Sequence, residues 1–102
     1  MNYPLISIII ATWNRKEDLR EVLDKYLSQN YKNIEIIVVD NNSTDGTIED
    51  LKTEYPTVTL ICLNENSGVK GYNVGMKAAK GEIVYLSDND AYLEDDGFFK
   101  IA

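Results

Sequence analysis

Two acidic residues, Asp88 and Asp90, follow closely on the apolar run 83–86 and are separated by a single residue. Carboxylate oxygens at that spacing can bind one hard cation, because Mg²⁺ and Mn²⁺ commonly take one or two protein carboxylates together with water and substrate phosphates. A cation held there would neutralise a diphosphate and stabilise it as a leaving group. The alternative is an acidic, solvated turn that begins the next helix, and the spacing alone leaves both interpretations open.

Asp40 ends a second apolar run, at the position where dinucleotide-binding sheets place an acid against the ribose hydroxyls. Its carboxylate can accept a hydrogen bond from a sugar hydroxyl or a base imide, or it can form an Asx turn with Asn41 and Asn42. Trp13 can stack on a base or sugar or fill the core, and Arg15 can pair with a phosphate or remain solvated. These residue types suit a ligand that has a base, a sugar and phosphate.

The charge and composition narrow the class of ligand. The formal charge is -7, from 17 acidic and 10 basic residues, and no basic run is present, which argues against nucleic acid as a partner. The chain has no histidine and a single cysteine, Cys62, so an internal disulfide, a thiolate metal cluster and histidine metal sites are excluded. We expect Cys62 itself to be buried. Any metal must therefore be held by oxygen ligands.

The longest apolar stretch near the start, residues 5–11, is too short to cross a bilayer. No leader rich in Lys or Arg precedes it. We therefore expect a cytoplasmic protein with no membrane segment in this chain.

Apolar runs and helical repeats alternate along the chain and would position these polar residues. Runs rich in β-branched residues predict strands at 5–11, 34–39, 58–63 and 83–86. Apolar residues at three- and four-residue spacing predict helices between them. Ser43 and Thr44 are alternative candidates to cap the second helix, and Asp45-Gly46 is a turn and helix-start signal. The order β-α-β-α-β-α-β predicts a three-layer, Rossmann-like α/β fold with a parallel sheet.

In a parallel sheet the carboxyl ends of all strands open onto one edge, and ligands bind there where the strand order reverses. The polar loops follow the four predicted strands, at residues 12–15, 40–45, 64–73 and 87–90. We therefore expect these four loops to meet on one side of the sheet.

Five sequence blocks, in their order and spacing, resemble the family 2 glycosyltransferases over essentially the whole chain. The blocks are residues 7–15, 38–47, 66–68 with 73–75, 79–84 and 88–90. The resemblance implies a GT-A fold and inverting transfer of a sugar from a nucleoside diphosphate sugar to an acceptor hydroxyl. The donor would be a UDP-, GDP- or dTDP-sugar, with a UDP-sugar expected first, and the acceptor a glycan or a lipid-linked sugar.

The resemblance also implies roles for particular residues. Asp40 would bind the base, and Asp88 and Asp90 would form a DxD pair that holds Mn²⁺ or Mg²⁺, with Asp88 also beside the donor. The remaining donor-binding residues implied by the resemblance are Thr12, Trp13, Asn14, Arg15, Asn66, Gly68 and Asn73.

Members of that family are considerably longer than this chain, which stops just past Asp90. We therefore expect residues 1–102 to be a single partial domain, a truncated GT-A fold, with the acceptor site and the general base beyond residue 102. General-base help is worth about 10² to 10⁴ in rate, so we expect negligible transfer by this chain alone. The full-length protein is expected in the cytoplasm, including at the inner face of the membrane, and an open sheet edge would favour self-association.

Two other classes remain as alternatives. A nucleotidyltransferase-like domain also combines an α/β sheet with metal-binding carboxylates, but it would carry a glycine-rich, lysine-bearing loop after the first strand. A non-catalytic receiver-type module would carry paired acids there. Residues 12–15, which are Thr, Trp, Asn and Arg, fit neither expectation.

Overall fold

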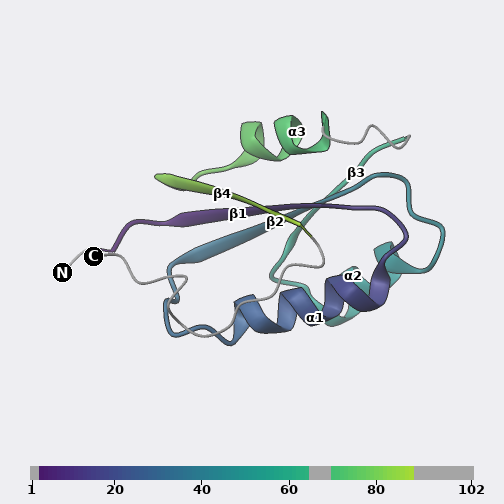
Figure 1. Ribbon diagram of the computed structural model, residues 1–102, viewed down its shortest axis with the longest axis horizontal. Helices are drawn as coiled ribbons and strands as arrows, with labels where there is room; N and C mark the ends of the chain where they lie inside the picture. Colours follow the sequence, from purple (N-terminus) through teal and green to yellow (C-terminus); the bar gives the residue numbers. More distant parts are fainter. Residues whose placement is uncertain (1–2, 65–69, 89–102) are drawn as a thin grey trace.

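The computed structural model describes residues 3–64 and 70–88 and contains alternating strands and helices (Figure 1). The elements are β1 (Ile6–Thr12), α1 (Lys16–Leu27), β2 (Ile34–Asp40), α2 (Thr47–Glu54), β3 (Thr59–Cys62), α3 (Lys70–Ala78) and β4 (Ile83–Asp88). The predicted β-α-β-α-β-α-β order is confirmed, with element ends that differ by a few residues.

The four strands form one parallel sheet in the order β3-β2-β1-β4. The chain moves outward in one direction from β1 through β2 to β3 and then returns to the other side of β1. The carboxyl end of β1 is therefore the point where the strand order reverses. The register pairs Thr12 with Asp40 and Ala11 with Asp88, so the two predicted acidic sites flank the end of β1.

Helices cover both faces of the sheet, with α1 and α2 on one face and α3 on the other (Figure 1). Alternate β1 residues Ile6, Ile8 and Ile10 belong to the larger core cluster, together with residues of α1 and α2. Ile9 points to the opposite face and packs in a smaller cluster with Ile37 and Val39 of β2. Burial on both faces explains why β1 and β2 are nearly continuous apolar runs instead of alternating patterns.

Helix α3 lies directly on the sheet because its inward residues are glycines. A Cβ atom at Gly75 would collide with Ile9, and one at Gly71 would lie 3.3 Å from Val39. Helix packing therefore accounts for these two glycines of α3.

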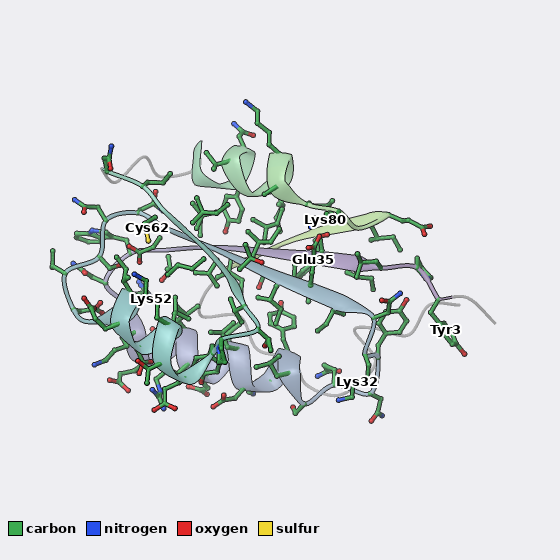
Figure 2. The ribbon with its side chains drawn as sticks, turned by 180° about the vertical axis from the view of Figure 1, so that it is seen from behind. Tyr3, Lys32, Glu35, Lys52, Cys62 and Lys80 are labelled. Carbon is green, nitrogen blue, oxygen red and sulfur yellow. The ribbon has the colours of Figure 1, made fainter. Side chains whose placement is uncertain are left out.

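At the amino ends of the strands, Glu35 of β2 is hydrogen-bonded to Lys80, which lies just before β4 (Figure 2). The hydroxyl of Ser7 donates to the Glu35 carboxylate and accepts from the Gly81 N–H at 2.8 Å. The Lys80 N–H donates to the same carboxylate at 2.5 Å. The entry to β4 is thus fixed by its neighbours in the sheet.

Both outer strands have exposed side chains. Ile83, Val84 and Leu86 of β4 are between 42% and 46% exposed. The expected burial of Cys62 is wrong, because β3 is an edge strand and its thiol is exposed. None of the helices in the described ranges combines the length and apolarity that crossing a membrane requires.

Candidate functional site

The candidate site begins where β1 and β2 end side by side. Thr12 and Asp40 are buried, as is Asn41, which follows β2. The Asn41 N–H donates to the Thr12 carbonyl at 2.8 Å, and the Asn41 side-chain amide lies 3.4 Å from the same oxygen. Sequence reasoning assigned Asn41 only to a turn, whereas the structure uses it to extend the pairing of the two strands beyond their ends.

The two carboxylate oxygens of Asp40 have different surroundings. Oδ2 accepts a hydrogen bond from the Ser43 N–H at 2.8 Å, three residues on, whereas the Asx turn considered from the sequence involved Asn41 and Asn42. Oδ1 is buried and meets no donor among the described residues. A buried acceptor without a partner costs about 1–3 kcal/mol, and more when it is charged. This oxygen is therefore suited to receive a hydrogen bond from a ligand.

The loops after β1 and β2 are interlocked through Asn14. Asn14 has a φ of 50°, a left-handed conformation that Asn tolerates better than most residues. Its N–H donates to the Ser43 hydroxyl at 2.9 Å, and its side-chain oxygen accepts from the Thr44 N–H at 2.7 Å. Ser43 and Thr44 are thus engaged with the neighbouring loop, and the expectation that one of them caps α2 is wrong.

Helix α2 instead begins after Gly46, whose φ of 93° favours glycine. Asp45 accepts from the Thr47 N–H and, in the other direction, from the Lys16 N–H of α1, each at 3.1 Å. Burial opposes ionisation of Asp45, but a hydrogen bond from the Thr47 hydroxyl and the two backbone bonds outweigh it and hold the pKa of its carboxyl below the ordinary value. The predicted Asp45-Gly46 helix start is confirmed, and Asp45 also fixes the start of α1.

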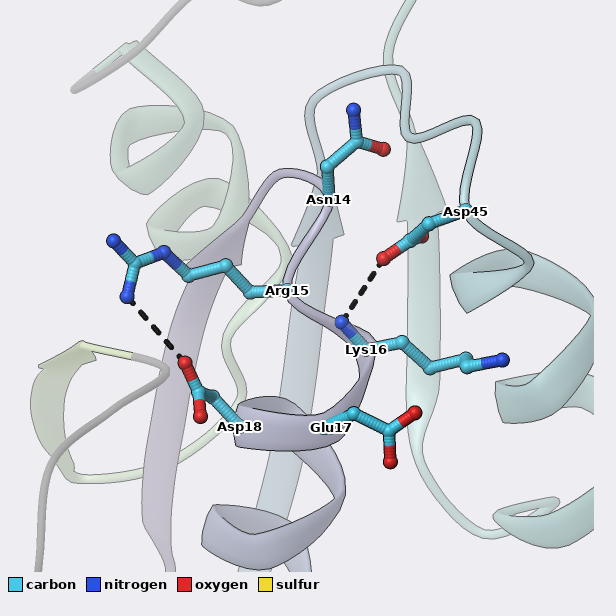
Figure 3. A pocket seen from close by; sticks show the side chains of 6 residues that line it. All are labelled: Asn14, Arg15, Lys16, Glu17, Asp18 and Asp45. Carbon is cyan, nitrogen blue, oxygen red and sulfur yellow. Dashed lines mark hydrogen bonds and ion pairs between the residues drawn. The ribbon is translucent and has the colours of Figure 1, made fainter.

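A hollow of about 500 Å³ lies at the start of α1, lined by Asn14, Arg15, Lys16, Glu17, Asp18 and Asp45 (Figure 3). Arg15 projects toward one side, where its guanidinium lies 3.4 Å from the Asp18 carboxylate, and both side chains are about half exposed. The lining mixes three acids with two bases, so it offers no concentrated positive charge for a phosphate. The arrangement favours the solvated interpretation of Arg15 within this hollow.

The other predicted residues are distributed around the same edge. Trp13 is 49% exposed, so it does not fill the core and its ring is available for stacking. Asn73 is exposed on α3, and Asp88 is the last residue of β4. Asn66, Gly68 and Asp90 lie outside the described residues. Within the described ranges no three acidic, histidine or cysteine residues are grouped closely enough to hold a metal ion.

Comparison with known proteins gives a consistent result. Residues 7–102 match the family described as glycosyl transferase family 2. The chain is 41% identical over 91 residues to the Escherichia coli UDP-Glc:alpha-D-GlcNAc-diphosphoundecaprenol beta-1,3-glucosyltransferase WfaP, which covers 86% of this chain and 36% of that protein. It is 36% identical to glycosyltransferase GlyA of Streptococcus pneumoniae, over 89% of this chain and 14% of that protein.

Solved structures with the same fold include two that are each 30% identical to this chain. One is S. aureus TarS 1-349 in complex with UDP, with a TM-score of 0.82 over 91% of this chain and 29% of that chain. The other is the mannosyltransferase PcManGT from Pyrobaculum calidifontis in complex with GDP-Man and Mn²⁺, with a TM-score of 0.79 over 93% and 30%. The chain spans about a third or less of the length of these relatives. On the match of residues 7–102 and the shared fold, the chain belongs to the family 2 glycosyltransferases.

Proposed function

We propose that this chain binds the nucleoside diphosphate end of a sugar donor, and that the protein that contains it transfers the sugar, with inversion, to an acceptor hydroxyl. The observation that carries the proposal is the buried Oδ1 of Asp40, which has no donor among the described residues and lies at the end of β2. A base imide N–H or a ribose hydroxyl can supply the missing hydrogen bond. The proposal therefore assigns Asp40 to the base or ribose.

Trp13 is the second support. It follows Thr12 directly, Thr12 is paired with Asp40 in the sheet, and the indole is half exposed. An aromatic ring in that position can stack on a base while Asp40 binds the edge of the base. Stacking of this kind is worth about 1–3 kcal/mol per base. Thr12 and Asn14 then shape the loop that carries the ring, and we assign Arg15 and Asn73 to the same donor site.

A divalent cation, Mn²⁺ or Mg²⁺, belongs to the same proposal. Asp88 ends β4 on the other side of β1 from Asp40, and with Asp90 it would hold the cation. The available ligands are carboxylate oxygens, which are the ligands that hard cations prefer. The cation, when bound, supplies charge neutralisation of the diphosphate. A protein of charge -7 has particular need of it.

The donor is proposed to be a UDP-sugar, since the E. coli relative is named for UDP-Glc and TarS was solved with UDP. We propose residues 1–102 as one partial domain, with the acceptor site, for a glycan or lipid-linked sugar, and the general base supplied by sequence beyond residue 102. A cytoplasmic location at the inner face of the membrane would suit a lipid-linked acceptor. We also propose that the protein self-associates through the outer edge of β4. The exposed apolar side chains of β4 support this proposal.

Calorimetric titration with UDP, GDP and dTDP, each with and without Mn²⁺, tests the proposal. We expect metal-dependent binding of at least one nucleotide, and we expect Asp40→Asn to abolish most of it. The Asn amide can keep the Ser43 bond through its oxygen, but its NH₂ group would then face the donor of the ligand. Glu21→Gln removes one charge from the exposed side of α1 and should have no effect. Absence of metal-dependent binding to all three nucleotides in the folded protein would contradict the proposal.

A further inference from the structure

Ser87, the residue before Asp88, is bonded from both faces of the sheet. Tyr26 of α1 donates its hydroxyl to the Ser87 hydroxyl at 2.7 Å, in a buried contact. Tyr72 of α3 donates its hydroxyl to the Ser87 carbonyl at 3.1 Å. Because α1 and α3 cover opposite faces (Figure 1), the end of β4 is attached to both helix layers.

The bond from Tyr72 acts on the peptide unit that leads into Asp88. The Ser87 carbonyl and the Asp88 N–H belong to one planar group, so a hydrogen bond to the carbonyl restrains the orientation of both. Tyr26 restrains the same residue through its side chain, because it donates to the Ser87 hydroxyl. Burial raises the pKa of the Tyr26 hydroxyl to about 12, so this group remains a protonated donor at neutral pH.

Strand β4 has one strand neighbour in the described part of the sheet, and its Tyr85 packs against the larger core cluster. Within residues 3–64 and 70–88, β4 pairs with β1 alone, and Ile83, Val84 and Leu86 are exposed. Ser87 is only 1% exposed, in contrast to these neighbours. The two tyrosines therefore attach the carboxyl end of this outer strand to the helices on both faces of the sheet.

We propose that Tyr26 and Tyr72 are positioning residues that set the backbone geometry at Asp88 for binding the cation and diphosphate. This inference rests on the proposed function. A purely structural role would change the stability of the protein but would leave the cation affinity of the folded protein unchanged. The two roles therefore differ in a measurable quantity.

The test compares Tyr72→Phe with Tyr31→Phe, which removes a matched bond, from a Tyr hydroxyl to the Pro4 carbonyl near the amino end of the sheet. The readouts are the Mn²⁺ dissociation constant with saturating UDP, from electron paramagnetic resonance of free Mn²⁺, and the UDP affinity without metal. Groups that orient metal ligands typically contribute about 10- to 100-fold to metal affinity. Because Tyr72 acts through the backbone, we expect a loss of about tenfold at most for Tyr72→Phe, with no change in metal-free UDP affinity. Tyr31→Phe should change neither quantity.

An unchanged Mn²⁺ dissociation constant in folded Tyr72→Phe would overturn the inference, as would an equal loss of metal-free UDP affinity. If the wild-type protein shows no Mn²⁺-dependent binding of UDP, GDP or dTDP, the proposed function fails and the positioning role fails with it. Mn²⁺-dependent binding that survives unchanged in Tyr72→Phe refutes the positioning role alone.

A second set of variants covers the case in which Tyr72→Phe does not fold. Tyr26→Phe and Ser87→Ala each remove one partner of the buried hydroxyl pair, and the double variant removes both with little change of shape. If the pair acts as a unit, the loss of Mn²⁺ affinity in the double variant should be no larger than in either single variant. Additive losses, or none, would count against the role of Tyr26.

Discussion

Replacing Glu35 with Gln should destabilise the protein at neutral pH by about 1–2 kcal/mol. The Glu35 carboxylate accepts from the Ser7 hydroxyl and from the Lys80 N–H. A hydrogen bond to a charged group contributes about 1.5–3 kcal/mol, against about 0.5–1.5 kcal/mol for a neutral pair. Lys80 is exposed, so water can accept from its N–H in place of Glu35. Ser7 is fully buried and has no such replacement from solvent. The loss of stability in Glu35→Gln therefore comes mainly from the weaker hydrogen bond between residue 35 and Ser7.

The effect should depend on pH in a defined direction. Burial opposes ionisation of Glu35, but the hydrogen bonds from Ser7 and Lys80 outweigh it and hold the pKa of the carboxyl below its ordinary value of 4.5. Because the pKa is lower in the folded state, this stabilisation is fully present above the unfolded pKa and is lost as the pH falls through the folded pKa. Protonated Glu35 is nearly isosteric with Gln, so the two proteins should become equally stable in acid.

Urea unfolding followed by circular dichroism measures the stability difference between the two proteins at pH 7 and at about pH 3. The free energy of unfolding in water is obtained by linear extrapolation to zero urea. Thermal unfolding gives a second measure, because 1 kcal/mol shifts the Tm by about 4–8 °C in a domain of this size. Glu21→Gln on the exposed side of α1 is the control and should have no effect at either pH. A stability difference that persists unchanged in acid, or that is absent at pH 7, would refute the reasoning.

Three further predictions follow from the site and its support. Trp13→Ala should weaken UDP binding by about 1–3 kcal/mol in calorimetry, while Trp13→Phe keeps most of the affinity; equal affinity for all three proteins would exclude stacking. Gly75→Ala should destabilise by about 1–3 kcal/mol in urea unfolding, because the added Cβ meets Ile9, whereas Lys77→Ala on the exposed side of α3 should be tolerated. Chelation by EDTA should lower UDP affinity and added Mn²⁺ should restore it; affinity that is insensitive to both would argue against a cation in the site.

The sequence alone was sufficient to predict the alternation of strands and helices and the edge of the sheet that carries the polar residues. The β-branched runs that became β1 and β2 have few alternatives to buried strands, and parallel pairing places all carboxyl ends together. Asp40 and Asp88 could therefore be assigned to one edge before any coordinate was known. The resemblance to the family implied roles for Asp40 and Asp88, and these roles stay predictions.

The tertiary structure decided which strand ends are neighbours and which polar groups satisfy one another. The strand order places Asp40 and Asp88 on either side of β1, and it exposes Cys62 by making β3 an edge. Asn14 bonds to Ser43, which lies 29 residues away, and Tyr26 bonds to Ser87, 61 residues away. Such partners leave no local pattern in the sequence, because a hydroxyl or amide can bond to any group that the fold brings within about 3 Å. For the same reason, only the folded chain shows that one oxygen of Asp40 has a donor and that the other meets none within the described part of the chain.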